Sequence, residues 1–196
     1  MPLIYFLRHI KTEANGKNIF CGRSESEPVP EDLESLCSIM APKVDEVFCS
    51  PMKRCVKTAE AAGYRDLKLR DDLKEIDFGD WEEKSFQNVS DEDPEMAKDY
   101  LSKPLLFKFP NGESLGDVRK RSGDFLNNDL MPLVKLDKDI MIVGHSGSLR
   151  LLIMEIMGLD DNFFWKFSLD PAKLTTLQYD NHSGGTSFFI KGMNTT

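Results

Sequence analysis

The hydrophobic positions of the chain fall into short apolar runs that alternate with amphipathic stretches. Four stretches have the apolar spacing of helices: Glu31–Met40, Lys53–Ala62, Glu113–Leu136 and Ser148–Met157. Six runs have the length and apolar content of strands: Leu3–Leu7, Val44–Cys49, Leu67–Arg70, Asp139–Val143, Leu174–Tyr179 and Ser187–Lys191. Strands that alternate with helices predict a three-layer α/β/α fold around a mostly parallel sheet.

Turn and capping residues mark the ends of several of these elements. Ser50-Pro51 predicts the start of the second helix, with Ser50 as its N-cap, and Ser114 with Asp117 predicts the start of the third. Gly158 is expected to end the last helix. A turn-rich segment, 180–185, separates the last two strands and predicts a hairpin, so that edge of the sheet is expected to be antiparallel.

One segment, about residues 84–111, fits the alternation of strands and helices poorly. We expect it to form an excursion above the sheet, of the kind that covers an active site as a lid. The rest of the alternation continues on both sides of this segment without a linker. The sequence therefore predicts a single domain over residues 1–196, with a lid-like excursion in its middle.

Charge and composition narrow the classes of partner. The 196 residues carry 25 Lys and Arg against 33 Asp and Glu, a net charge of −8, which argues against nucleic-acid binding but not against a small anionic substrate. No apolar stretch approaches 18 residues and no signal peptide is recognised, so we expect no membrane association and a cytoplasmic location, as a monomer or homodimer. The four cysteines form no CxxC pair, so no zinc site is predicted.

Side chains that can bind or attack a phosphoryl group follow three of the predicted strands. Arg8-His9 ends the first strand, at the edge where open α/β sheets bind ligands. An imidazole can act as a nucleophile, and a guanidinium can hold a phosphate. Arg54 lies in the first turn of a helix, where a cation usually answers to a nearby anion. His145 ends an apolar strand and precedes a helix whose N-terminal amides can receive an anion.

In combination these segments resemble the histidine phosphatase superfamily, also called the phosphoglycerate mutase-like family. Two residues depart from its pattern, since Ile10 and Glu83 stand where the family usually has glycine. The matching motifs follow the family's order over nearly the whole chain: Arg8-His9 with Thr12 and Asn15, Ser50-Pro51-Met52-Lys53-Arg54 with Thr58-Ala59, Leu73, Glu75, Gly79 and Glu82, Gly112-Glu113-Ser114, and Gly144-His145-Ser146-Gly147.

The resemblance implies a phosphoglycerate mutase-like fold and a role for each matched residue. His9 is expected to attack phosphorus and become a phosphohistidine, while Glu75 protonates the leaving oxygen and then activates water. Arg8, Arg54 and His145 are expected to hold the phosphoryl oxygens, so that no metal and no cofactor is required. The resemblance also implies substrate-binding positions, which are Thr12, Asn15, Gly22 and Ser146.

Three functions are compatible with this set: a small-molecule phosphomonoesterase, a cofactor-dependent phosphoglycerate mutase, and a weakly active phosphate-ligand binder or regulator. The mutases of the family carry arginines in the covering segment, and here no arginine occurs between Arg70 and Arg119. A binder would be expected to lose His9 or Glu75, and both are present. The phosphomonoesterase is therefore favoured, acting on a small-molecule phosphate ester.

The substrate is predicted from the covering segment and from one motif. The segment offers aromatic and aliphatic side chains that would suit a partly apolar leaving group. Leu73–Lys84 most resembles the α-ribazole phosphatases of cobalamin synthesis, whose leaving group carries an aromatic base. The sequence thus indicates α-ribazole phosphate as a candidate substrate.

Overall fold

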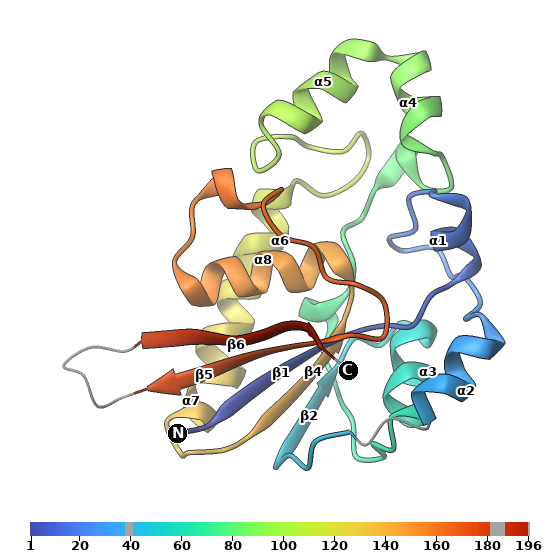
Figure 1. The fold of residues 1–196 in the computed structure, drawn as a ribbon. Helices are drawn as coiled ribbons and strands as arrows, with labels where there is room; N and C mark the ends of the chain where they lie inside the picture. Colours follow the sequence, from blue (N-terminus) through green and yellow to red (C-terminus); the bar gives the residue numbers. More distant parts are fainter. Residues whose placement is uncertain (38–40, 181–186, 196) are drawn as a thin grey trace.

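The computed structural model describes residues 1–37, 41–180 and 187–195. Within them lies a sheet of six strands in the order β3-β2-β4-β1-β5-β6 (Figure 1). The first four pair in parallel, β5 pairs antiparallel with β1, and β6 antiparallel with β5. The predicted sheet type is confirmed, while the predicted turn at 181–185 lies outside the described residues. The strands are β1 Leu3–Arg8, β2 Glu46–Cys49, β3 Lys68–Leu69, β4 Ile140–Gly144, β5 Leu174–Asp180 and β6 Ser187–Thr195.

Helices cover both faces of the sheet, as predicted for a three-layer fold. They are α1 Glu13–Lys17, α2 Pro30–Cys37, α3 Lys53–Ala61, α4 Phe86–Glu92, α5 Pro94–Ser102, α6 Leu115–Phe125, α7 Met131–Val134 and α8 Ser146–Met157. In Figure 1, α6 and α8 lie on one face of the sheet and α2 and α3 on the other. None of the helices in the described part of the chain is long and apolar enough to cross a membrane.

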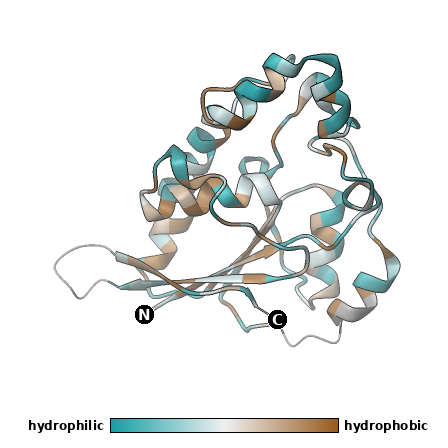
Figure 2. Ribbon diagram, turned by 45° about the horizontal axis from the view of Figure 1, so that its top comes forward, coloured by the Kyte–Doolittle hydropathy of each residue, from teal (hydrophilic) through white to brown (hydrophobic). Residues whose placement is uncertain are grey.

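The central strands are buried on both faces because successive side chains point to opposite sides. In β4, Ile140 and Ile142 join the core cluster beneath α6 and α8, while Met141 and Val143 join the cluster beneath α3. Figure 2 shows hydrophobic residues along α8 and the strands, and hydrophilic residues on the outer helices. The two cores fix the sheet between the helix layers, and with it the strand ends that carry the polar residues.

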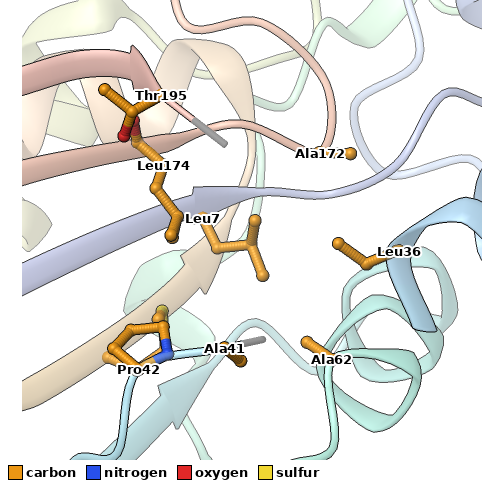
Figure 3. A pocket seen from close by; sticks show the side chains of 9 residues that line it. Leu7, Leu36, Ala41, Pro42, Ala62, Ala172, Leu174 and Thr195 are labelled. Atoms are coloured by element: carbon orange, nitrogen blue, oxygen red, sulfur yellow. The ribbon is translucent and has the colours of Figure 1, made fainter. Parts of the chain in front are cut away.

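A small apolar cavity lies between the sheet and helices α2 and α3 (Figure 3). Leu7 of β1, Leu36 of α2 and Ala62 at the end of α3 line it, and its volume is about 20 Å³. A space of this size holds one water molecule at most, and its lining is largely apolar. It is a packing gap rather than a ligand site.

Several helix ends follow the capping signals and one does not. Ser114 caps α6 in a capping box with Asp117, and Gly158 ends α8 with φ 63°, both as predicted. Ser50 is not the N-cap of α3, because that position is Met52. The reason lies in tertiary structure, since the Ser50 hydroxyl is 2.8 Å from the Nε2 atom of a histidine, His145.

The long predicted helix, Glu113–Leu136, is interrupted. After α6 the backbone forms a π-helical turn over Leu126–Leu130 and then continues as α7. Pro132 lies in the first turn of α7, and it has no N–H to donate to the preceding turn. A proline at this point explains why the regular α-helical hydrogen bonds give way to the wider turn.

The excursion at 84–111 forms α4 and α5, which lie beyond α6 and α8 on the side away from the sheet (Figure 1). Ser85 caps α4, and Asp93 caps α5 before Pro94. Tyr100, Phe107 and Phe109 pack with Trp81 in a third core cluster and are at most 8% exposed. These aromatic side chains therefore hold the excursion together, whereas the sequence suggested them as a lining for the leaving group.

Candidate active site

Two histidines meet at the carboxyl edge of the sheet. His9 follows β1 and His145 follows β4, its parallel neighbour, and the His9 backbone N–H donates to the carbonyl oxygen of Gly144 at 2.9 Å. The centroids of the two rings are 5.1 Å apart, with their planes at 65°. The pair predicted from the sequence is thus brought together, because the strands that carry it end side by side.

The surroundings of His9 determine its protonation. Its Nδ1 atom lies 2.6 Å from the carbonyl oxygen of Ile10, which can only accept, so Nδ1 carries the proton and Nε2 keeps a lone pair. Burial, together with the charges of Arg54 and Arg8, lowers the pKa of His9 to about 3. His9 is therefore neutral at physiological pH, with one nitrogen ready to act as a nucleophile.

Ile10 takes the place of the usual glycine without disturbing this arrangement. Its side chain is fully buried in the interior, and its backbone N–H donates to the Thr58 hydroxyl at 3.0 Å. The carbonyl oxygen that orients His9 belongs to the backbone of Ile10. The substitution therefore adds core packing and leaves the groups that hold the His9 ring in place.

His145 is held in the opposite tautomer. The Nε atom of Arg54 donates to His145 Nδ1 at 3.2 Å, so the proton of the ring is on Nε2, which lies 2.8 Å from the Ser50 hydroxyl. Burial, and then the charge of Arg54, lower the pKa of His145 well below its ordinary value. The Cys55 sulfur is 3.3 Å from the same Nε2 atom. His145 is thus a neutral, fully buried ring with a fixed orientation.

Arg54 is buried in the first turn of α3, with 1% of its surface exposed. Besides the bond to His145, its guanidinium donates to the carbonyl oxygens of Ser24 at 2.9 Å, Gly22 at 2.7 Å and Cys21 at 3.3 Å. The sequence suggested a nearby anion to compensate the positive charge of Arg54. Main-chain carbonyl dipoles provide most of that compensation instead. The charge of Arg54 is consequently fixed in direction before any ligand arrives.

Glu82 holds the same loop from its other side. Its carboxylate accepts hydrogen bonds from the backbone N–H groups of Gly22, Arg23 and Ser24 and from the Ser24 hydroxyl, at 2.5 to 3.3 Å. Gly22 is the tightest point of the loop, because a Cβ atom there would lie 1.9 Å from the carbonyl oxygen of Ile76. The motif that contains Glu82 was visible in the sequence, but its action on Arg54 through the loop was not.

Glu75 lies at the N-terminus of α8. Its carboxylate accepts from the backbone N–H groups of Gly147 at 3.1 Å and Ser148 at 2.9 Å, and it is 7% exposed. The helix end that the sequence predicted to receive an anion therefore receives this carboxylate. Ser146 is the first residue of the same helix, directly after His145. The acid and the second histidine are in this way fixed to one strand–helix junction.

Arg121, which no sequence pattern singled out, holds the backbone of Glu75 in place. Its Nη2 atom donates to the Glu75 carbonyl oxygen at 3.1 Å, and its guanidinium bonds both carboxylate oxygens of Glu113. Glu113 also pairs with Arg23 of the loop at 3.2 Å. An arginine in the middle of an amphipathic helix gives no sequence signal for such a role, because its partners come from distant segments.

Arg8 and the Thr12–Asn15 pair complete the predicted set. Arg8 donates to the carbonyl oxygen of Leu169 at 2.6 Å, and burial lowers its pKa, an effect that the charge of Glu75 offsets only in part. The side-chain oxygen of Asn15 accepts from both the backbone N–H and the hydroxyl of Thr12, which shapes the start of α1. Arg8 thus lies among the charged site residues, while Thr12 and Asn15 bond to each other.

The arrangement is chemically suited to phosphoryl transfer supported by arginines. Cationic side chains lie near a neutral imidazole with a lone pair, and a buried carboxylate of the kind that can carry a proton is held at the N-terminus of α8. Among the described residues, no three His, Cys, Asp or Glu side chains are gathered as a metal site would need. The prediction that the reaction uses no metal stays a prediction.

Comparison with known proteins gives a consistent result. The sequence model of the histidine phosphatase superfamily, branch 1, matches residues 4–189. The chain is 25% identical to phosphoserine phosphatase 1 of Hydrogenobacter thermophilus, over 92% of this chain and 88% of that protein. It is 26% identical to the adenosylcobalamin/α-ribazole phosphatase of Escherichia coli, over 86% of each.

A solved structure has the same fold. It is the phosphoserine phosphatase from Entamoeba histolytica in complex with 3-phosphoglyceric acid, with a TM-score of 0.85 and 23% identity. The match covers 100% of this chain and 98% of that one. The fold predicted from the motifs is confirmed by this similarity.

Proposed function

We propose that this chain, which belongs to the histidine phosphatase superfamily, hydrolyses small-molecule phosphate monoesters through a phosphohistidine on His9, without a metal ion. Its relatives in that family include phosphatases named for phosphoserine and for α-ribazole phosphate. The proposal assigns the nucleophile to His9, the general acid to Glu75 and the substrate to small-molecule phosphate monoesters. The observation that carries it is the bond from His9 Nδ1 to the Ile10 carbonyl oxygen, which leaves Nε2 unprotonated beside two arginines.

In the first step, the Nε2 lone pair of His9 attacks phosphorus while the bond from phosphorus to the leaving oxygen breaks. Glu75 donates its proton to that oxygen, so the product alcohol leaves neutral. Arg8 and Arg54 neutralise the charge on the phosphoryl oxygens. His145, whose Nδ1 accepts from Arg54 and whose Nε2–H faces the Ser50 hydroxyl, holds the Arg54 guanidinium in place. The phosphorylated ring keeps its Nδ1–H bond to the Ile10 carbonyl, which stabilises the positive charge that the ring acquires.

In the second step, Glu75 acts as a base. Its carboxylate takes a proton from a water molecule as the oxygen of that water attacks phosphorus, and the bond from phosphorus to His9 Nε2 breaks. Inorganic phosphate leaves, and His9 is again neutral. The same carboxylate serves both steps because it returns to its protonated form at the end of the cycle.

We also propose that α4 and α5 cover the site. The ring of Tyr100 in α5 lies 6.3 Å from that of Phe20, next to the loop that binds Arg54. The catalytic groups are nearly closed to solvent, since His9 is 5% exposed. Substrate entry then requires this cover to move. α-Ribazole phosphate stays a candidate substrate on sequence similarity.

The test is the trapping of a phosphoenzyme. The wild-type protein is mixed with labelled phosphate ester and quenched; we expect a phosphorylated chain whose label is stable in alkali and lost in acid, as for a phosphohistidine. The His9→Ala variant should lack both the label and the release of inorganic phosphate. A His9→Ala variant that hydrolyses p-nitrophenyl phosphate at the wild-type rate would overturn the proposal.

The role of Glu75 is tested with two leaving groups. Glu75→Gln should slow the hydrolysis of an alkyl phosphate by about 10²- to 10⁴-fold, because an alkoxide needs its proton. The same variant should hydrolyse p-nitrophenyl phosphate with a much smaller loss in the first step, because nitrophenolate leaves without one. Equal slowing of both esters contradicts the acid role.

A further inference from the structure

The side chain of Arg8 is held by a single hydrogen bond among the described residues. Its Nη1 atom donates to the carbonyl oxygen of Leu169 at 2.6 Å, and its Nε atom is buried with no acceptor in the described part of the chain. Arg54, in contrast, donates to three backbone carbonyls and to His145. The direction of Arg8 therefore depends on where one carbonyl lies, and thus on the path of the segment that carries Leu169.

That segment, residues 168–173, contacts Arg8 at two points. Leu169, whose carbonyl accepts from the guanidinium, is buried with 3% of its surface exposed. The Ala172 backbone N–H donates to the Arg8 carbonyl oxygen at 3.1 Å. The segment is thus bonded to both the side chain and the main chain of Arg8, and a shift of the segment would turn the guanidinium with it.

Asn194 in β6 holds this segment in place. Its side-chain oxygen accepts from the Asp170 backbone N–H at 2.8 Å, and its Nδ2 atom donates to the Ser168 carbonyl oxygen at 3.1 Å. The amide thereby bridges the residues before and after Leu169, whose carbonyl accepts from Arg8. Because a side-chain amide has both a donor and an acceptor, it can fix the position and the orientation of a backbone segment at once.

A β-bulge in β6 brings the Asn194 amide to this point. β6 pairs with β5 at Thr195 and next at Gly192, three residues earlier, whereas the two partners on β5 are only two residues apart. Asn194 lies in the longer stretch with φ 51°, a left-handed conformation in which asparagine is enriched. Bulges beside active sites re-aim side chains, and this one directs an amide from the strand toward a neighbouring loop.

We propose that Asn194 is a positioning residue of the active site, which sets the direction of Arg8 by holding the carbonyl oxygen of Leu169 in place. The inference rests on the proposed function, in which Arg8 neutralises charge on the phosphoryl oxygens. Asn194 acts through the backbone and not on the substrate. The guanidinium is then already directed when the ester binds, so less reorganisation is needed at the moment of reaction.

A guanidinium depends on such support more than an ammonium group would. Its N–H groups lie in one plane, and it binds two phosphoryl oxygens only when the edge of that plane faces them. Misplacement of a binding group by about 1 Å can cost about 10²-fold in rate. Loss of the Asn194 amide is therefore expected to reduce catalysis, although no group that contacts the ester is removed.

The first measurement uses Asn194→Gly, because glycine keeps the left-handed backbone and only the side-chain amide is lost. We expect kcat/KM for p-nitrophenyl phosphate to fall about 5- to 20-fold, and the dissociation constant of inorganic phosphate, measured by calorimetry, to rise by a similar factor. The matched control is Asn18→Gly, at an exposed asparagine that ends α1 with φ 53°. The control should keep the wild-type values. Wild-type values in Asn194→Gly overturn the inference.

A double-mutant cycle separates the positioning of Arg8 from a general effect on the fold. Arg8→Lys replaces the planar guanidinium by a rotatable ammonium group, whose action needs no fixed plane. In that background, Asn194→Gly should change kcat/KM and phosphate binding by less than about twofold. Thermal unfolding establishes the temperature below which each variant is folded, and all assays are run there. An equal effect of Asn194→Gly in both backgrounds overturns the inference and makes Asn194 a structural residue.

Trapping of the phosphoenzyme distinguishes this inference from the proposed function. A wild-type protein that forms no phosphohistidine overturns the proposed function, and the calorimetric cycle still tests the link from Asn194 to Arg8 because it needs no turnover. A wild-type protein that forms a phosphohistidine, but in which Asn194→Gly acts equally in both backgrounds, overturns the inference alone.

Discussion

Arg54 and His145 are joined by a hydrogen bond that only a neutral His145 can accept. The Nε–H of Arg54 lies 3.2 Å from His145 Nδ1, so a proton on Nδ1 would place two N–H groups and two positive charges against each other. The same guanidinium lowers the pKa of His9. Burial, reinforced by this one arginine, therefore keeps both histidines unprotonated, and the stability of the protein depends on pH as a result.

We expect the free energy of unfolding to fall as the pH is lowered from 7 to 5. The folded-state pKa of His9 is about 3 and that of His145 is also well below 6.5, so below pH 6.5 the unfolded chain binds protons that the folded chain does not. The loss approaches about 1.4 kcal/mol per pH unit for each histidine. Urea unfolding at several pH values measures it, and a His9→Gln/His145→Gln variant should show a shallower slope. An unchanged slope in that variant contradicts the prediction.

Gly22→Ala should damage the protein and Gly16→Ala should not. A Cβ atom at Gly22 would meet the Ile76 carbonyl oxygen at 1.9 Å, whereas one at Gly16 has nothing within 4 Å. We expect Gly22→Ala to lower the free energy of unfolding by about 1–3 kcal/mol, and to reduce activity because the loop that orients Arg54 must shift. Thermal unfolding and phosphatase assays of both variants check this. Equal behaviour of the two variants would sink it.

Glu82→Gln should lower activity without removing a reacting group. The neutral amide accepts more weakly from the Gly22–Ser24 backbone, and its NH₂ group faces N–H donors, so Arg54 loses its fixed direction. We expect kcat/KM for p-nitrophenyl phosphate to fall about 10- to 100-fold and inhibition by inorganic phosphate to weaken. The control is Glu92→Gln, which removes an exposed carboxylate paired with Lys84. Unaltered inhibition by inorganic phosphate in Glu82→Gln would contradict the view that Glu82 orients Arg54 through the Gly22–Ser24 loop.

Glu83→Gly should stabilise the protein. Glu83 has φ 64°, in the left-handed region that costs an L side chain energy, and it stands where the family usually has glycine. The free energy of unfolding should rise by about 0.5–1 kcal/mol, with activity unchanged. Lys98→Gly, on the exposed side of α5, is the matched control and should lower stability by about 1 kcal/mol. A loss of stability in Glu83→Gly refutes this reading.

The fold was predictable because its signals are local. Apolar runs in β1 and β4, the capping box at Ser114 and the glycine at 158 each act within a few residues, and the structure has them as predicted. The meeting of His9 with His145 followed from one rule of topology, that neighbouring parallel strands end at the same edge. These features needed no knowledge of long-range contacts.

The remaining features depend on partners far away in the chain. Ser50 has the sequence of a helix cap, but its hydroxyl points to His145, 95 residues later. Arg121 and Glu82 act on backbone atoms of other segments, and a backbone carbonyl or N–H leaves no mark in the sequence.

The way in which Arg54 is held also bears on how such an enzyme can diverge. Its acceptors at Cys21, Gly22 and Ser24 are carbonyl oxygens, which every amino acid possesses. Substitution of the side chain at a position such as Cys21 therefore leaves the acceptor in place. Mutation can therefore change the side chains that an incoming ester contacts while Arg54 keeps its orientation. Gly22 is the position of this loop where substitution is least tolerated, because any Cβ atom there would force the backbone to move.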